Sequence, residues 1–71
     1  MGVHQSKTEP QVRVRQVANV FSHAEVEQMS KRVLIGMMRR QYGIPRRVLP
    51  DRIPTEYGWE FRFRWFEVEA D

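Results

Sequence analysis

The chain has 71 residues, enough for one small domain, and a domain of this size buries only ~60% of the surface that its unfolded chain exposes. It has no cysteine, which excludes disulfides and thiolate chemistry. Its two histidines, with no cysteine to join them, are too few ligands for a structural zinc site. The net charge is +3, and ten of the twelve basic residues are arginine, which favours contact with phosphate or carboxylate groups.

The first ten residues, MGVHQSKTEP, show no apolar periodicity and end in proline. They predict a flexible tail at 1–10 in front of a single domain at 11–71. Gly2 and Ser6 match the N-myristoylation signal M-G-x-x-x-[ST], and the basic Lys7 suits such a signal. In this hypothesis the Gly2 amine carries the lipid, while Ser6 and Lys7 are recognition residues. The alternative is a chance match in an ordinary tail.

The segment QVRVRQV, from residue 11, alternates apolar and basic side chains. Val12 and Val14 point to one side and Arg13 and Arg15 to the other, which predicts a half-buried strand.

A helix start follows at FSHAEV. Ser22 and Glu25 have the spacing of a capping box, and Phe21 and Val26 have that of a hydrophobic staple, so we expect a helix from His23. The pattern predicts one continuous helix of about 20 residues, ended by Gly43 in a left-handed conformation. Its expected buried stripe comprises Val26, Met29, Val33 and Met37, widened by Ser30, Leu34 and Met38. Gly36 predicts the close approach of another backbone, either that of the sheet or that of a second subunit.

Pro45, Pro50 and Pro54 exclude a helix from the segment after Gly43, which we expect to cross the surface, with a short edge strand near 47–49 as an option. The final segment, WEFRFRWFEVEAD, predicts a strand whose inner face is aromatic. After Trp65 the apolar phase shifts to Phe66 and Val68. This shift predicts a β-bulge, the end of the strand, or a region covered on both faces as in a dimer.

The predicted fold is a small α/β (α+β) domain in the order strand, long helix, proline-rich loop, long strand. Two strands alone are marginal in water. We therefore expect a partner chain to complete the sheet.

The sequence gives little support for catalysis. Ser22 is used as a helix cap, His23 points outward at the first helical turn, and no glycine-rich phosphate loop is present. Glu67 and Glu69 could hold a cation, but a solvated strand face explains them as well. We expect no enzymatic activity, no cofactor, no metal and no small-molecule substrate.

Charge is segregated along the chain. The stretch from residue 31 to residue 52 carries +6, and the remainder carries −3. We expect this stretch to bind phosphate or an acidic partner through Lys31, Arg32, Arg39, Arg40, Arg46, Arg47 and Arg52. A second basic stripe on the outer sheet face is expected from Arg13, Arg15, Arg62 and Arg64. The opposing interpretation is neutralisation in space by Glu25, Glu27, Glu56, Glu60 and Glu67.

The resulting hypothesis is a small non-catalytic adaptor or assembly subunit. It would be cytoplasmic and bind another protein chain, either a second copy or a larger complex. A lipid on Gly2 and the basic residues would together hold it on the cytosolic face of an anionic membrane, because one myristoyl chain alone binds only marginally. The alternatives are a small basic nucleic-acid-binding protein and a soluble protein-binding inhibitor or adaptor.

Overall fold

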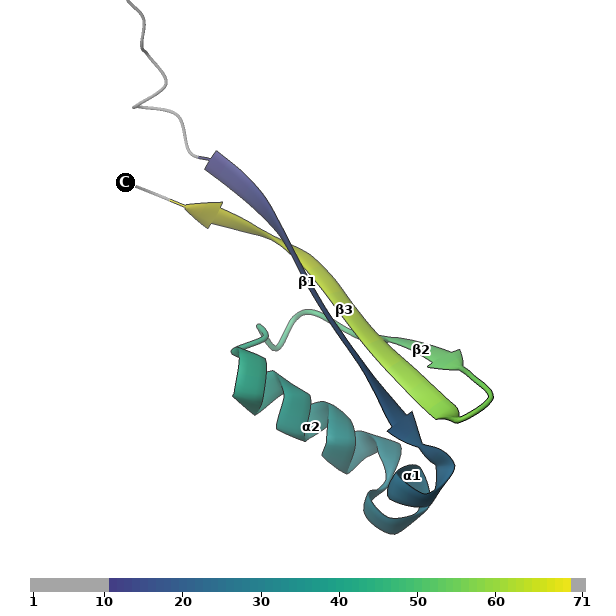
Figure 1. Ribbon diagram of the computed structural model, residues 1–71. Coiled ribbons are helices and arrows are strands. Elements are labelled where there is room, and N and C mark those ends of the chain that lie inside the picture. The colour runs from purple at the N-terminus through teal and green to yellow at the C-terminus, as the bar shows by residue number, and fades with distance from the viewer. Residues whose placement is uncertain (1–10, 70–71) are drawn as a thin grey trace, which may run out of the picture.

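The computed structural model describes residues 11–69. In chain order it contains β1 (Gln11–Ser22), α1 (His23–Met29), α2 (Lys31–Tyr42), β2 (Asp51–Pro54) and β3 (Gly58–Glu69). The strands form an antiparallel sheet in the order β1-β3-β2, and α2 runs along one side of it (Figure 1). The predicted mixed α+β domain is therefore confirmed. Gly2, Ser6 and Lys7 lie outside the described residues, so lipidation stays a prediction.

The third strand comes from the chain itself. β2 pairs with β3 from Asp51↔Arg62 to Pro54↔Trp59. The edge strand suggested near 47–49 was therefore misplaced. The prolines explain the position, because Pro50 precedes the strand and Pro54 ends it on the sheet edge, where a missing N–H is tolerated. Completion of the sheet by a partner stays a prediction.

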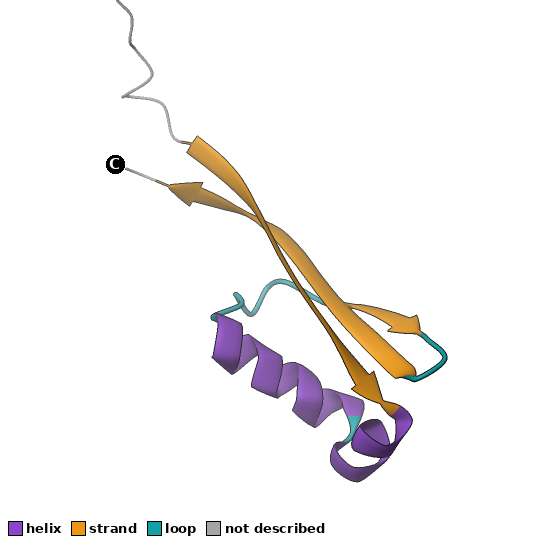
Figure 2. Ribbon diagram, in the orientation of Figure 1, coloured by secondary structure: helices purple, strands orange, loops and turns teal. Residues whose placement is uncertain are grey.

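The core lies between α2 and the central strand. Phe61, Phe63 and Trp65 of β3 are buried, as the alternating pattern predicted. They pack with a cluster of apolar side chains from α2 and the following loop, namely Leu34, Ile35, Met38, Ile44 and Val48. Figure 2 shows both helices on the same side of the strands. Among residues 11–69, no helix lies on the opposite face of the sheet.

The predicted single helix is wrong, because the chain breaks it at Ser30. This residue has φ 78° and ψ 151°, an unusual conformation for a residue with a side chain. Its backbone N–H closes α1 on the Val26 carbonyl at 2.8 Å, and its hydroxyl accepts from the Val33 N–H at 3.3 Å to begin α2. One serine thus caps two helices. The capping box at Ser22 and Glu25 and the left-handed Gly43 were predicted correctly.

The break at Ser30 also changes which residues are buried. α2 turns Leu34, Ile35 and Met38 toward the sheet. Met29, Val33 and Met37, expected along the centre of the buried stripe, are instead exposed. The prediction extended one apolar pattern across Ser30. Because the helix breaks at Ser30, the side chains of α2 point in other directions than they would in a continuous helix. Only Val26 of the original central line packs against the core, where it is partly buried.

The pairing of β1 with β3 has no bulge. The register is continuous over both strands, from Gln11↔Glu69 to Ser22↔Gly58. The bulge or strand end predicted near Trp65 is therefore wrong. The apolar residues change phase because they change sides: up to Trp65 they face α2, and from Phe66 onward they occupy the opposite face of the same unbroken strand.

Ser30 gives a test of the helix break. Backbone strain of this kind costs about 1–3 kcal/mol, and replacing a capping serine by glycine costs only a few tenths. We expect Ser30→Gly to raise the free energy of unfolding by about 1 kcal/mol. Ser30→Ala should lower it by about 1 kcal/mol, because it removes the cap and keeps the strain. Urea unfolding followed by tryptophan fluorescence measures both values, and a similar loss in both variants would contradict the description.

Two glycines give a second, matched test. A Cβ on Gly58 would collide with backbone atoms of Phe21, Ser22 and His23, whereas a Cβ on Gly36 would meet nothing within 4 Å. Within residues 11–69, the close approach of the sheet predicted for Gly36 is therefore wrong, and the alternative approach by a second subunit stays a prediction. We expect Gly58→Ala to lower the free energy of unfolding by about 3 kcal/mol or more. Gly36→Ala should raise it by roughly 0.5–1 kcal/mol, since alanine is the better helix former. Equal effects in urea unfolding would refute the contrast.

Candidate functional site

Two surfaces stand out, and the first is at the end of the sheet that α2 does not cover. There β1 and β3 continue as a two-stranded ribbon beyond β2 and α2 (Figure 1). Val12 pairs with Val68 and Val14 pairs with Phe66. We call these four residues the distal apolar face. Their exposed fractions are 63% and 58% for Val12 and Val14, and 60% and 65% for Phe66 and Val68.

The opposite side of the same ribbon is polar. Arg15 forms an ion pair with Glu67 at 3.6 Å, and the Trp65 indole N–H donates to the same carboxylate at 3.3 Å. Arg13 lies on this side as well, opposite Glu67 in the register. The ribbon therefore has an apolar side and a charged side. In the part of the sheet that α2 covers, the apolar side faces α2, whereas in the ribbon the apolar side faces away from α2.

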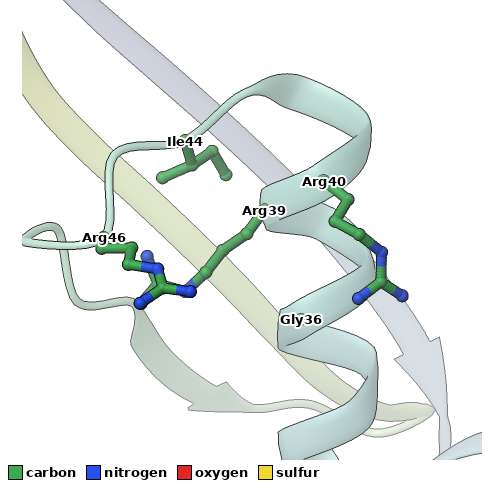
Figure 3. A pocket seen from close by; sticks show the side chains of 5 residues that line it. All are labelled: Gly36, Arg39, Arg40, Ile44 and Arg46. Atoms are coloured by element: carbon green, nitrogen blue, oxygen red, sulfur yellow. The ribbon is translucent and has the colours of Figure 1, made fainter.

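The second surface is a pocket of about 410 Å³ at the C-terminal end of α2. It is lined by Gly36, Arg39, Arg40, Ile44 and Arg46. Figure 3 shows the Arg39 side chain extending from α2 toward Arg46 of the following loop, while Arg40 leaves the helix on the other side of Gly36. Gly43 makes this arrangement possible, because its left-handed conformation (φ 65°) ends the helix and turns the loop back along it.

Arg39 is the fixed member of this group. Its Nη1 donates to the Pro45 carbonyl at 2.9 Å, and its guanidinium lies 5.3 Å from the centre of the Phe63 ring. Arg40 and Arg46 are exposed, and neither forms an ion pair within residues 11–69. We call these three residues the arginine pocket.

The structure does not gather the rest of the predicted basic cluster there. Lys31 places its ammonium group 3.5 Å from the centre of the Trp59 ring, and Arg47 donates to the Phe66 carbonyl at 3.4 Å. Arg32 is exposed in the first turn of α2, and Arg52 is exposed on β2. Of the seven residues, Arg39 and Arg46 lie together, Arg40 lines the same pocket from the other side of Gly36, and the other four occupy separate positions.

The four sheet arginines are likewise divided. Arg13 and Arg15 occupy the face toward α2, whereas Arg62 and Arg64 occupy the other face, so they do not form one stripe. Three of the five acidic residues expected to neutralise the basic ones contact a sheet arginine or the helix cap instead of the arginine pocket. Glu60 pairs with Arg62 at 2.8 Å, Glu67 pairs with Arg15, and Glu25 accepts from the Ser22 N–H. Within residues 11–69, neutralisation of the arginine pocket by these carboxylates is not seen.

The described residues hold no cluster of three or more histidine, cysteine, aspartate or glutamate side chains that could bind a metal. His23 is exposed at the start of α1, and the Ser22 hydroxyl accepts from the Glu25 N–H at 3.1 Å, as a cap does. No helix in this part of the chain is long and apolar enough to cross a bilayer.

Comparisons with family models, with curated proteins and with solved structures find no match.

The distal apolar face is the part of the candidate site that sequence reasoning did not assign. Its signal was the phase change after Trp65, which was visible but explained in part by a bulge.

Proposed function

We propose that this protein is a non-catalytic assembly subunit that binds another protein chain through the distal apolar face. We propose further that the bound partner is a second copy of the same protein. The observation that supports the proposal is the exposure of all four side chains in two cross-strand pairs. Such a patch on a small soluble domain is typical of an interaction site.

Stability favours a partner at this position. A two-stranded ribbon is at best marginally stable in water. Here α2 packs on the other side of the sheet and β2 reaches only residues 59–62 of β3. Burying a valine or phenylalanine side chain completely contributes ~1.5–3 kcal/mol relative to full exposure. Covering Val12, Val14, Phe66 and Val68 would therefore stabilise the least supported part of the sheet.

Chemistry favours a second copy packed face to face. In a two-fold contact the same patch serves both subunits, and an uncharged apolar patch fits itself without bringing like charges together. Antiparallel pairing of two β1 edges is less favourable, because it would set Arg13 and Arg15 of one copy against those of the other. Four side chains fall short of the ~800 Å² per partner of standard interfaces, so we expect a weak, concentration-dependent dimer.

A matched pair of lysine substitutions tests the proposal. Val14 and Val20 lie on the same strand and the same face and are 58% and 54% exposed, but Val20 lies opposite Glu60 near the other end of β1. We expect sedimentation equilibrium of the wild type to show monomers and dimers. Val14→Lys should raise the dimer dissociation constant at least about tenfold, which corresponds to ~1.4 kcal/mol.

Val20→Lys should leave the dissociation constant near the wild-type value. Circular dichroism of both variants checks that the fold is kept. A wild type that stays monomeric at every accessible concentration contradicts self-association. Equal weakening by the two lysines would show that dimers form through another surface.

A further inference from the structure

The arginine pocket is a separate surface, and its charge arrangement is unusual. Its lining contains Arg39, Arg40 and Arg46 and no acidic residue, and the side chains of Arg39 and Arg46 extend toward one another on one side of Gly36 (Figure 3). The negative end of the α2 dipole accounts for Arg39 and Arg40, which lie in the last turn. It does not account for Arg46, which the loop brings back beside Arg39 (Figure 3).

The pocket is also partly pre-organised. The Pro45 carbonyl and the Phe63 ring hold the Arg39 guanidinium, which has five N–H donors and uses one of them for the Pro45 carbonyl. Gly36 lines the pocket, and a Cβ there would meet nothing within 4 Å, so no side chain obstructs this part of it. The volume of about 410 Å³ lies within the range of small-ligand sites.

We propose that the arginine pocket binds a compact phosphorylated group carrying two or more negative charges. The positive charge of three arginines is larger than the negative charge of one carboxylate. A pyrophosphate or a bisphosphorylated headgroup balances this charge and offers several oxygens to the planar N–H groups. A nucleic-acid strand fits less well. It requires a continuous basic track, and Arg32, Arg47 and Arg52 lie outside the pocket.

The same phosphate chemistry could come from a free polyphosphate or from a lipid headgroup, and two measurements on the full chain separate these sources. Calorimetric titration with pyrophosphate at low salt measures binding to the free group. Co-sedimentation with phosphatidylcholine vesicles, with or without a phosphatidylinositol bisphosphate, measures binding to the headgroup. Binding in either assay with the residue dependence below supports the site, and the assay that responds identifies the source.

Arg46→Gln is the informative variant, because the Arg46 side chain is exposed and has no ion pair within the described part of the chain. A hydrogen bond to a charged group contributes ~1.5–3 kcal/mol, so we expect pyrophosphate affinity to fall about tenfold or more. Arg64→Gln makes the same charge change at an exposed position on the opposite face of the sheet, and it should change affinity by less than about twofold. Thermal unfolding should be unchanged in both.

Several results would overturn the proposal. Equal losses in Arg46→Gln and Arg64→Gln would show a general effect of net charge. Absence of binding in both assays at low salt would exclude the site. A polyglutamate peptide that binds as tightly as pyrophosphate would assign the pocket to acidic proteins. A single-stranded oligonucleotide that binds more tightly, with a steep salt dependence, would assign it to nucleic acid.

Discussion

The unbroken antiparallel ladder between β1 and β3 is the interaction on which the rest of this structure depends. Because side chains alternate along a strand, a fixed register determines which residues meet α2 and which meet solvent. It places Phe61, Phe63 and Trp65 in the core. The same register, carried on without a bulge, places Phe66 and Val68 on the other side. The core residues of β3 and the distal apolar face therefore belong to the same β1–β3 ladder.

The second constraint is the path of the chain between the outer strands. β1 and β2 run parallel on either side of β3, so the intervening segment must cross the sheet. Ser30 divides this crossover into two helices, and Gly43 turns it back at the far end. The turn at Gly43 determines where Arg46 lies relative to α2. It brings the loop residue Arg46 back to a pocket that Arg39 and Arg40 also line.

Local signals in the sequence predicted much of this fold. The capping box at Ser22, the glycine stop at residue 43 and the aromatic side of β3 were each determined by a short pattern, and each was predicted correctly. The helix error arose where one pattern was followed past a break in the chain. Ser30 was placed in the buried stripe, because the capping box at Ser22 and the long apolar pattern favoured a continuous helix, and only the structure shows it as a cap.

The candidate sites were less accessible to prediction. The distal apolar face depends on whether the phase change after Trp65 is absorbed by a bulge, and that depends on β1, which is distant in the sequence. The arginine pocket depends on a loop conformation that brings residues 39 and 46 together. Composition predicted a basic surface, but only the fold separates the three arginines of the pocket from the four basic residues outside it.

Concentration-dependent amide hydrogen exchange tests the central claim most directly, because it reports on each part of the chain in the unmodified protein. If two copies pack through the distal apolar face, raising the protein concentration will slow exchange in the ribbon, at residues 12–15 and 65–68. Exchange in α2 will stay unchanged. Exchange in the ribbon that does not depend on concentration would contradict the claim, and slowing confined to α2 would place the contact on the exposed side of that helix.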